Sequence, residues 1–301
     1  MVASGTFGYG DEVQDLVDIS KIGCIITKSV TLEPREGNPP PRIHETSSGM
    51  LNSIGLANVG INEFCDKKLP YLNKMKTHFI INIAGSTFEE YIDTLRLLEN
   101  QDNSNHIGYE INISCPNVKE GGVAFGNYPD MSARVVEACR NVTDKPLITK
   151  LSPNQTDIAA NARACIEAGS DALAVINTIM GMAIDVETQR PIIGNVQGGL
   201  SGPAIRPIAL LKVHQVYEVA GPKGIPILGQ GGIETAADAI EFLLAGATTI
   251  GLGTALFYDP LAAKKINSGI EDYLGRHGFS SVADLTGQLN LSDMQNTPAS
   301  D

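Results

Sequence analysis

Short apolar runs rich in β-branched residues alternate with amphipathic segments along almost the whole chain, and this alternation limits the possible folds more than any other feature. Several runs are apolar on both faces, as in parallel strands that are covered by helices. The predicted strands are residues 22–29, 78–83, 109–114, 147–151, 172–177, 225–228 and 248–251. The predicted helices are residues 11–18, 61–75, 88–99, 130–139, 156–168, 203–219, 235–245 and 260–273.

Repeated βα units without a break in composition predict one domain, and 301 residues are enough for an α/β barrel, which needs roughly 250. We therefore predict a (β/α)8 TIM barrel over residues 1–287, followed by a polar, disordered tail at residues 288–301. The eighth strand has to be residues 1–4. Because so short a strand lies at the lower limit of usual lengths, we expect that the sequence begins inside a longer gene product, at an internal Met.

Composition restricts the partners and the compartment. A formal net charge of −12 argues against nucleic acid, which needs clustered Lys and Arg. No apolar run reaches membrane-spanning length, and no signal peptide opens the chain. The five cysteines are scattered without CxxC spacing, which predicts no metal site, no iron–sulfur cluster and no disulfide framework. We expect a cytoplasmic protein.

Polar residues stand at the ends of the otherwise apolar strands, where a barrel carries its working groups. A single lysine at a strand end usually just reaches solvent, but five such tips would converge on one cavity. The predicted tips are Lys28 with Ser29, Asn82, Asn112 with Cys115, Lys150, and Asn177 with Thr178.

Glycine clusters at residues 198–203, 229–232 and 251–254 indicate a phosphate site. Glycine lets backbone N–H groups approach a phosphate, and the loops after strands seven and eight are the usual phosphate site of this fold. Each cluster alone could be an ordinary tight turn. The long proline-rich loop at residues 32–46 is either a surface segment or a wall of the site, and residues 52–58 suit a planar, amide-rich ligand.

Cys115 lies at the end of a predicted strand, before Pro116, and its position allows two interpretations of its role. Cysteine is among the most commonly buried residues, so it could be structural. The strand tip, the flanking amides and the glycine-containing residues 118–127, which could form a mobile lid, favour a reactive thiol instead.

These motifs together resemble the dihydroorotate dehydrogenase family over nearly the whole chain. The resemblance rests on residues 3–8, on 27–31 with 34–39, on 52–56, 112–117 and 198–203, and on the pairs Gly231-Gly232 and Gly253-Thr254. Cys115, where the membrane-bound class has serine, indicates the soluble class 1. Residues 177–182 leading to residues 198–202 look like the NAD-linked subclass 1B. The resemblance also implies that an N-terminal hairpin and part of the first strand, which precede residues 3–8 in the family, are missing.

The resemblance implies oxidation of (S)-dihydroorotate to orotate, in pyrimidine (UMP) biosynthesis, on one bound FMN. Cys115 would remove a proton from C5 while C6 passes hydride to the flavin, and Lys28 would assist catalysis. Electrons would pass to NAD through a partner subunit that carries FAD and a [2Fe-2S] cluster, around a homodimeric core within a heterotetramer.

The resemblance also implies two sets of binding residues. The implied substrate-binding residues are Lys28, Asn52, Ser53, Ile54, Gly55, Leu56, Asn112, Asn177 and Thr178. The implied FMN-binding residues are Ser4, Lys28, Ser29, Asn82, Asn112, Lys150, Ile176, Gly202, Gly231, Gly232, Gly253 and Thr254. Three alternatives stay open: a fumarate-linked subclass 1A enzyme, a barrel like dihydropyrimidine dehydrogenase, and a barrel that binds a ligand without catalysis.

Overall fold

A computed structural model describes residues 1–101, 104–114, 116–117 and 123–292 of the chain. Seven parallel strands form one curved sheet in the order β1-β4-β5-β8-β9-β14-β15. They are β1 (Cys24–Ile26), β4 (His78–Ile83), β5 (Tyr109–Asn112), β8 (Leu147–Leu151), β9 (Ala172–Val175), β14 (Ile227–Gln230) and β15 (Thr249–Gly251).

The first residues of the chain close this sheet into a ring. Val2 bridges in parallel to Ile25 of β1 on one side and to Leu252, just after β15, on the other. The Val2 N–H donates to the Cys24 carbonyl at 3.0 Å, and the Ala3 N–H donates to the Leu252 carbonyl at 2.8 Å. The predicted eighth strand therefore exists as a very short pairing, and the predicted barrel is confirmed.

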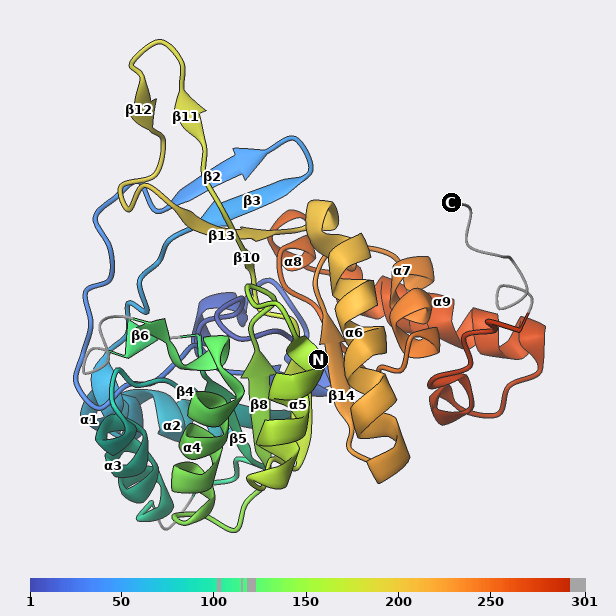
Figure 1. Cartoon of the computed structure of the whole chain (residues 1–301), viewed down its shortest axis with the longest axis horizontal. Coiled ribbons are helices and arrows are strands. Elements are labelled where there is room, and N and C mark those ends of the chain that lie inside the picture. Colours follow the sequence, from blue (N-terminus) through green and yellow to red (C-terminus); the bar gives the residue numbers. More distant parts are fainter. Residues whose placement is uncertain (102–103, 115, 118–122, 293–301) are drawn as a thin grey trace.

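Helices cover the outside of the barrel (Figure 1). They are α1 (Gly60–Glu63), α2 (Leu69–Leu72), α3 (Phe88–Glu99), α4 (Pro129–Arg140), α5 (Ile158–Glu167), α6 (Arg206–Ala220), α7 (Ala236–Leu244), α8 (Ala255–Tyr258) and α9 (Ala262–His277). Helix α3 shows why these segments are helical. The Thr87 hydroxyl caps it by accepting from the Glu90 N–H, and Tyr91, Leu95 and Leu98 bury one stripe at helical spacing.

Two predicted helices are wrong in detail. Residues 11–18 form only a 3₁₀ turn, Asp11–Val13, after the left-handed Gly10, and a second turn, Ile19–Lys21, begins after Asp18. Residues 61–75 are not one helix, since a π-helical turn, Phe64–Lys68, separates α1 from α2. Pro70 lies in the first turn of α2, where its missing N–H and its ring prevent a continuous α-helical hydrogen-bond ladder.

A second, antiparallel sheet stands over one end of the barrel (Figure 1). Its order is β10 (Ile179–Gly181), β13 (Gly198–Ser201), β3 (Gly49–Asn52) and β2 (Ile43–Thr46). A hairpin of β11 (Ile184–Asp185) and β12 (Arg190–Pro191) projects from it, away from the barrel. None of these strands was predicted from the sequence, because they are short and two of them begin with glycine.

Part of the predicted lid also has regular structure. β6 (Pro116–Asn117) pairs with β7 (Val123–Ala124), and a 3₁₀ turn, Phe125–Asn127, follows. Residues 118–122 lie outside the described part of the chain, as do residues 293–301 of the predicted tail. Within the described ranges, no helix is both long and apolar enough to cross a membrane.

The barrel interior changes character along its axis. Cys24, Ile26, Ile80, Ala174 and Leu228 pack together as an apolar cluster inside the ring. Toward the carboxyl ends of the strands the inward-facing residues become polar. This change separates a packed base from a polar cavity, as expected of a TIM barrel.

Candidate active site

A cavity of about 690 Å³ lies at the carboxyl ends of the barrel strands, between the ring and the antiparallel sheet. Strand tips, the N-terminal segment and the glycine loops all contribute to its lining. The predicted site residues that line it are Ser4, Lys28, Ser29, Asn52, Ser53, Ile54, Gly55, Leu56, Asn112, Lys150, Ile176, Asn177, Thr178, Gly202, Gly231, Gly232, Gly253 and Thr254. The convergence expected from the barrel is therefore present, and the role of each residue stays a prediction.

The remaining two predicted residues are Cys115 and Asn82. Cys115 lies outside the described residues, between Ser114, which lines the cavity, and Pro116, which begins β6. Asn82 is fully buried and lies behind the lining, where its side chain contacts Ser29 and Glu110 rather than the open space.

The four cysteines that the structure describes are poor nucleophiles. Burial raises the pKa of the Cys24, Cys139 and Cys165 thiols to about 12 and that of Cys65 to about 11. A thiol reacts as the thiolate, so these four are inert near neutral pH. Cys115 therefore remains the candidate nucleophile or base.

A buried polar relay runs beneath the cavity across neighbouring strands. The Ser29 hydroxyl donates to Asn82 Oδ1 at 2.5 Å, and Asn82 Nδ2 donates to Glu110 Oε1 at 2.5 Å. Lys150 Nζ lies 3.9 Å from the same Glu110 oxygen. The relay fixes Ser29 and Lys150, its two cavity-facing ends, through two residues that no ligand in the cavity needs to touch.

A second cluster fixes the tips of β5 and β9. Asn177 Nδ2 donates to the Ser114 hydroxyl at 2.8 Å, and Asn177 Oδ1 accepts from the Thr178 N–H at 2.8 Å. The Tyr91 hydroxyl donates to the Asn112 carbonyl at 2.7 Å. These contacts hold Asn112 and Asn177 at the edge of the cavity, which both residues line. A side-chain amide carries both donors and acceptors, which suits a planar ligand with its own amide groups.

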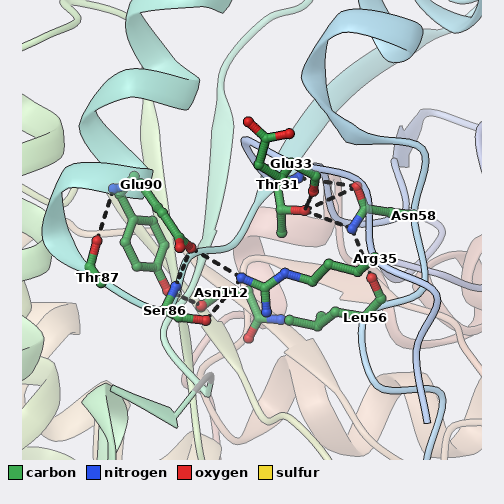
Figure 2. A network of polar contacts seen from close by, with 10 residues as sticks. Thr31, Glu33, Arg35, Leu56, Asn58, Ser86, Thr87, Glu90 and Asn112 are labelled. Atoms are coloured by element: carbon green, nitrogen blue, oxygen red, sulfur yellow. Dashed lines mark hydrogen bonds and ion pairs between the residues drawn. The ribbon is translucent and has the colours of Figure 1, made fainter. Parts of the chain in front are cut away.

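The proline-rich loop forms a wall of the cavity, to which it contributes Asn38 and Ile43. This is one of the two alternatives that the sequence left open. Figure 2 shows Arg35 reaching from this loop to the start of α3, where its guanidinium donates to Ser86 Oγ at 2.9 Å and Glu90 Oε2 at 3.0 Å. Asn58 donates from its side chain to the Leu56 carbonyl at 2.8 Å (Figure 2). The lining segment 52–56 is therefore anchored to the barrel.

The glycine loops form a narrow cradle that side chains would fill. Gly202, Gly231 and Gly232 have φ angles of +92°, +131° and +81°, a conformation that other residues rarely adopt. A Cβ on Gly232 would lie 2.7 Å from the Gly202 carbonyl oxygen. Nearby, the Thr254 hydroxyl donates to Ser201 Oγ at 2.7 Å. Backbone without side chains, together with small hydroxyl groups that line the cavity, fits the phosphate end of FMN.

Three lining or supporting residues were not predicted from the sequence: Glu110, Ser114 and Gln230. Glu110 shares a strand face with Asn112, and the two-residue alternation of β5 could have revealed it. Ser114 lines the cavity and lies within residues 112–117, one of the segments that carry the family resemblance. Gln230 lines the cavity from β14 and donates to the Ile176 carbonyl at 3.1 Å.

Fold and cavity define a class of protein: a TIM-barrel enzyme whose site has two lysines, several amides and a cradle of glycine loops. Residues 1–274 match the family described as dihydroorotate dehydrogenase. The chain belongs to the dihydroorotate dehydrogenase family.

Curated relatives agree with this assignment. The chain is 54% identical to a protein of Geotalea daltonii, over 97% of this chain and 94% of that protein. It is 52% identical to a Geobacter sulfurreducens protein, again over 97% and 94%. Both relatives are named "Dihydroorotate dehydrogenase B (NAD(+)), catalytic subunit".

Proposed function

We propose that this chain oxidises (S)-dihydroorotate to orotate with one bound FMN, in the biosynthesis of pyrimidines. The observation that carries the proposal is the convergence of Lys28, Lys150, the amides and the glycine cradle on one cavity. The cradle fits the FMN phosphate, and the amides fit the pyrimidine ring. The names of the relatives support the same substrate.

FMN, when bound, supplies the acceptor for the hydride that leaves C6 of dihydroorotate. The protein supplies the base and the binding groups. In this proposal the Cys115 thiolate takes the proton from C5, so that the C5–C6 double bond of orotate forms, and later releases that proton to solvent. Lys28 binds the substrate carboxylate and favours the thiolate by its positive charge, and Lys150 stabilises the negative charge of the reduced cofactor.

The remaining assignments follow from the family. NAD is the final electron acceptor, reached through a partner subunit that carries FAD and a [2Fe-2S] cluster, with a homodimer of this chain within a heterotetramer. The enzyme works in the cytoplasm, and residues 1–287 form its catalytic domain, with residues 288–301 as a tail. Activity with NAD that depends on a co-purified flavin and iron–sulfur subunit supports this arrangement. Activity with fumarate by this chain alone contradicts it.

Cys115→Ser tests the base. A hydroxyl is a far weaker base than a thiolate, so the variant should bind FMN normally but lose most turnover at neutral pH. The measurements are the flavin absorbance of the purified protein and steady-state oxidation of dihydroorotate. Cys65→Ser, at the most exposed of the described cysteines, is the matched control and should keep full activity. Unchanged turnover in Cys115→Ser would exclude the thiol as the base.

Substrate choice is tested with dihydrouracil, which lacks the carboxylate. The proposal expects turnover of dihydroorotate only, because Lys28 would pair with the carboxylate. A colourless protein that binds no FMN would instead support a ligand-binding barrel without catalysis.

A further inference from the structure

Glu110 is a carboxylate in the interior of the barrel, with no solvent exposure. Oε1 accepts from Asn82 at 2.5 Å, and Oε2 is buried without a hydrogen-bond partner among the residues that the structure describes. Burying a carboxylate costs considerable free energy unless a charge and hydrogen bonds compensate it. Apolar residues would fill this space at lower cost, so fold stability alone does not account for Glu110.

The compensating charge is Lys150, whose Nζ lies 3.9 Å from Glu110 Oε1. Lys150 lines the cavity, whereas Glu110 is not part of the lining. The two residues stand on adjacent strands, where Glu110 pairs with Ile148 and Asn112 with Lys150 in parallel register. Glu110 therefore lies closer to the base of the barrel than Lys150 does. Its carboxylate is on the side of the ammonium group that faces away from the cavity and from any ligand there.

We propose that Glu110 is a positioning residue that holds the Lys150 ammonium at the floor of the cavity and weakens its positive field there. This inference rests on the proposed function, in which FMN lies above Lys150. Positive charge near the ring stabilises the anionic reduced flavin and raises its reduction potential. A carboxylate behind that charge opposes the effect, because Coulomb interactions are strong in the poorly screened interior. Glu110 thus keeps the potential of the bound flavin lower than Lys150 alone would set it.

Glu110→Gln removes the charge and keeps the shape and an acceptor oxygen for Asn82. The full chain loaded with FMN is titrated with sulfite, which forms an anionic adduct with flavin, and its midpoint potential is measured. We expect sulfite to bind on the order of tenfold more tightly in the variant, since one buried charge at close range changes an equilibrium by about that factor. The midpoint potential should shift to a more positive value.

Glu99→Gln is the matched control. Glu99 accepts from Tyr109 and pairs with Lys145 at 3.1 Å, and neither Glu99 nor its partners line the cavity. Its loss should leave sulfite affinity and potential as in the wild type. A merely structural role for Glu110 predicts the same unchanged values in Glu110→Gln. Unchanged or weaker sulfite binding in that variant, with FMN bound, would overturn the proposal.

If Glu110→Gln does not fold, Lys150→Met and the double variant Lys150→Met/Glu110→Gln provide the same comparison. The double variant should bind sulfite more tightly than Lys150→Met does, and equal or weaker binding would contradict the role of Glu110.

Urea unfolding of the full chain without FMN tests the pairing independently of the cofactor. Each single variant leaves one buried charge without its partner, so the double variant should be less destabilised than the sum of the single effects. Additive effects would overturn the pairing. A wild-type chain that binds no FMN would instead refute the proposed function, and this cycle would still test Glu110 with Lys150.

Discussion

At the scale of single residues, the cradle of glycine loops at the cavity depends on positions where only glycine fits. Gly202, Gly231 and Gly232 all have positive φ angles, and each would bring a Cβ within 2.8 Å of a neighbouring atom. Gly232 would meet both the Gly202 carbonyl and Arg206. Strain and lost space act together here, so a methyl group should harm both folding and phosphate binding.

Gly232→Ala should therefore weaken FMN binding at least about tenfold and lower the free energy of unfolding by roughly 1–3 kcal/mol. FMN titration by fluorescence and urea unfolding measure the two effects. Gly275→Ala is the control, since Gly275 lies in α9 with no atom within 4 Å of an added Cβ. It should stabilise the protein by about 0.5–1 kcal/mol and leave FMN affinity unchanged.

His106 is a buried titratable side chain outside the cavity. Its Nδ1 contacts Ser104 Oγ at 2.5 Å, its Nε2 is buried without a hydrogen-bond partner among the described residues, and its ring packs against Phe79 and Tyr109. Burial, with a smaller contribution from Lys145, lowers the pKa of His106 to about 4. The folded protein therefore contains His106 as the neutral imidazole at pH values above about 4.

The sign of the pH effect follows. Between about pH 6.5 and pH 4 the unfolded chain takes up a proton on this histidine and the folded chain does not. The free energy of unfolding should fall across this range by roughly 2–3 kcal/mol more in the wild type than in His106→Gln. Urea unfolding at several pH values measures it, and since the carboxylates contribute to both curves, the difference isolates His106. If the free energy of unfolding falls equally with pH in the wild type and in His106→Gln, the buried neutral His106 does not contribute to the pH dependence.

At the scale of elements, the loop over the cavity is held by contacts to α3 and to its own neighbours. Arg35 joins it to Ser86 and Glu90, and Asn58 exchanges backbone hydrogen bonds with Arg35 at 3.0 Å and 2.9 Å. The Arg35 side chain is partly exposed, at 28%. Its ion pair should therefore contribute about 1 kcal/mol, mainly to the order of the loop.

Arg35→Met should raise the KM for dihydroorotate roughly fivefold, the equivalent of about 1 kcal/mol, and change kcat less, because the variant loosens the segment that carries Asn52 and Leu56. Steady-state kinetics and limited proteolysis of the loop measure this. Arg96→Met is the matched control, since Arg96 pairs with Asp93 on the exposed face of α3. A normal KM for dihydroorotate in Arg35→Met would show that the ion pair does not contribute to substrate binding.

The sequence predicted those helices and strands whose hydrophobic pattern lies within their own residues. The bounds of β4, β8 and α3 match the expected ranges, because apolar runs and apolar residues at helical spacing lie within these segments themselves. The antiparallel sheet was missed, since Gly49 and Gly198 begin strands that only long-range pairing stabilises. The contact of Arg35 with Glu90 joins residues far apart in the chain, so no local pattern contains it.

At the scale of the whole molecule, one cavity is lined by residues from around the ring. A ligand there contacts the strand tips and the glycine loops at once. It therefore binds only the folded barrel and stabilises it by mass action.

FMN at about 100 times its Kd should add about 2.7 kcal/mol and raise Tm by roughly 4 °C, since a chain of 301 residues has a large entropy of unfolding. Riboflavin, which lacks the phosphate, should raise Tm much less at the same concentration, because the glycine cradle then has nothing to bind. Thermal unfolding followed by circular dichroism compares the two ligands. Equal shifts would show that the cradle does not bind the phosphate.

The bonds that close the ring have a consequence for synthesis in the cell. The Leu252 N–H donates to the Met1 carbonyl at 3.0 Å, a contact between residues far apart in the chain. During translation the edges of β1 and of the growing sheet stay open until β15 has left the ribosome. Open strand edges favour pairing with other chains, and contacts between distant residues form slowly. A nascent chain of this protein is therefore exposed to misassembly for most of its translation, and chaperones that shield strand edges should bind it during that interval.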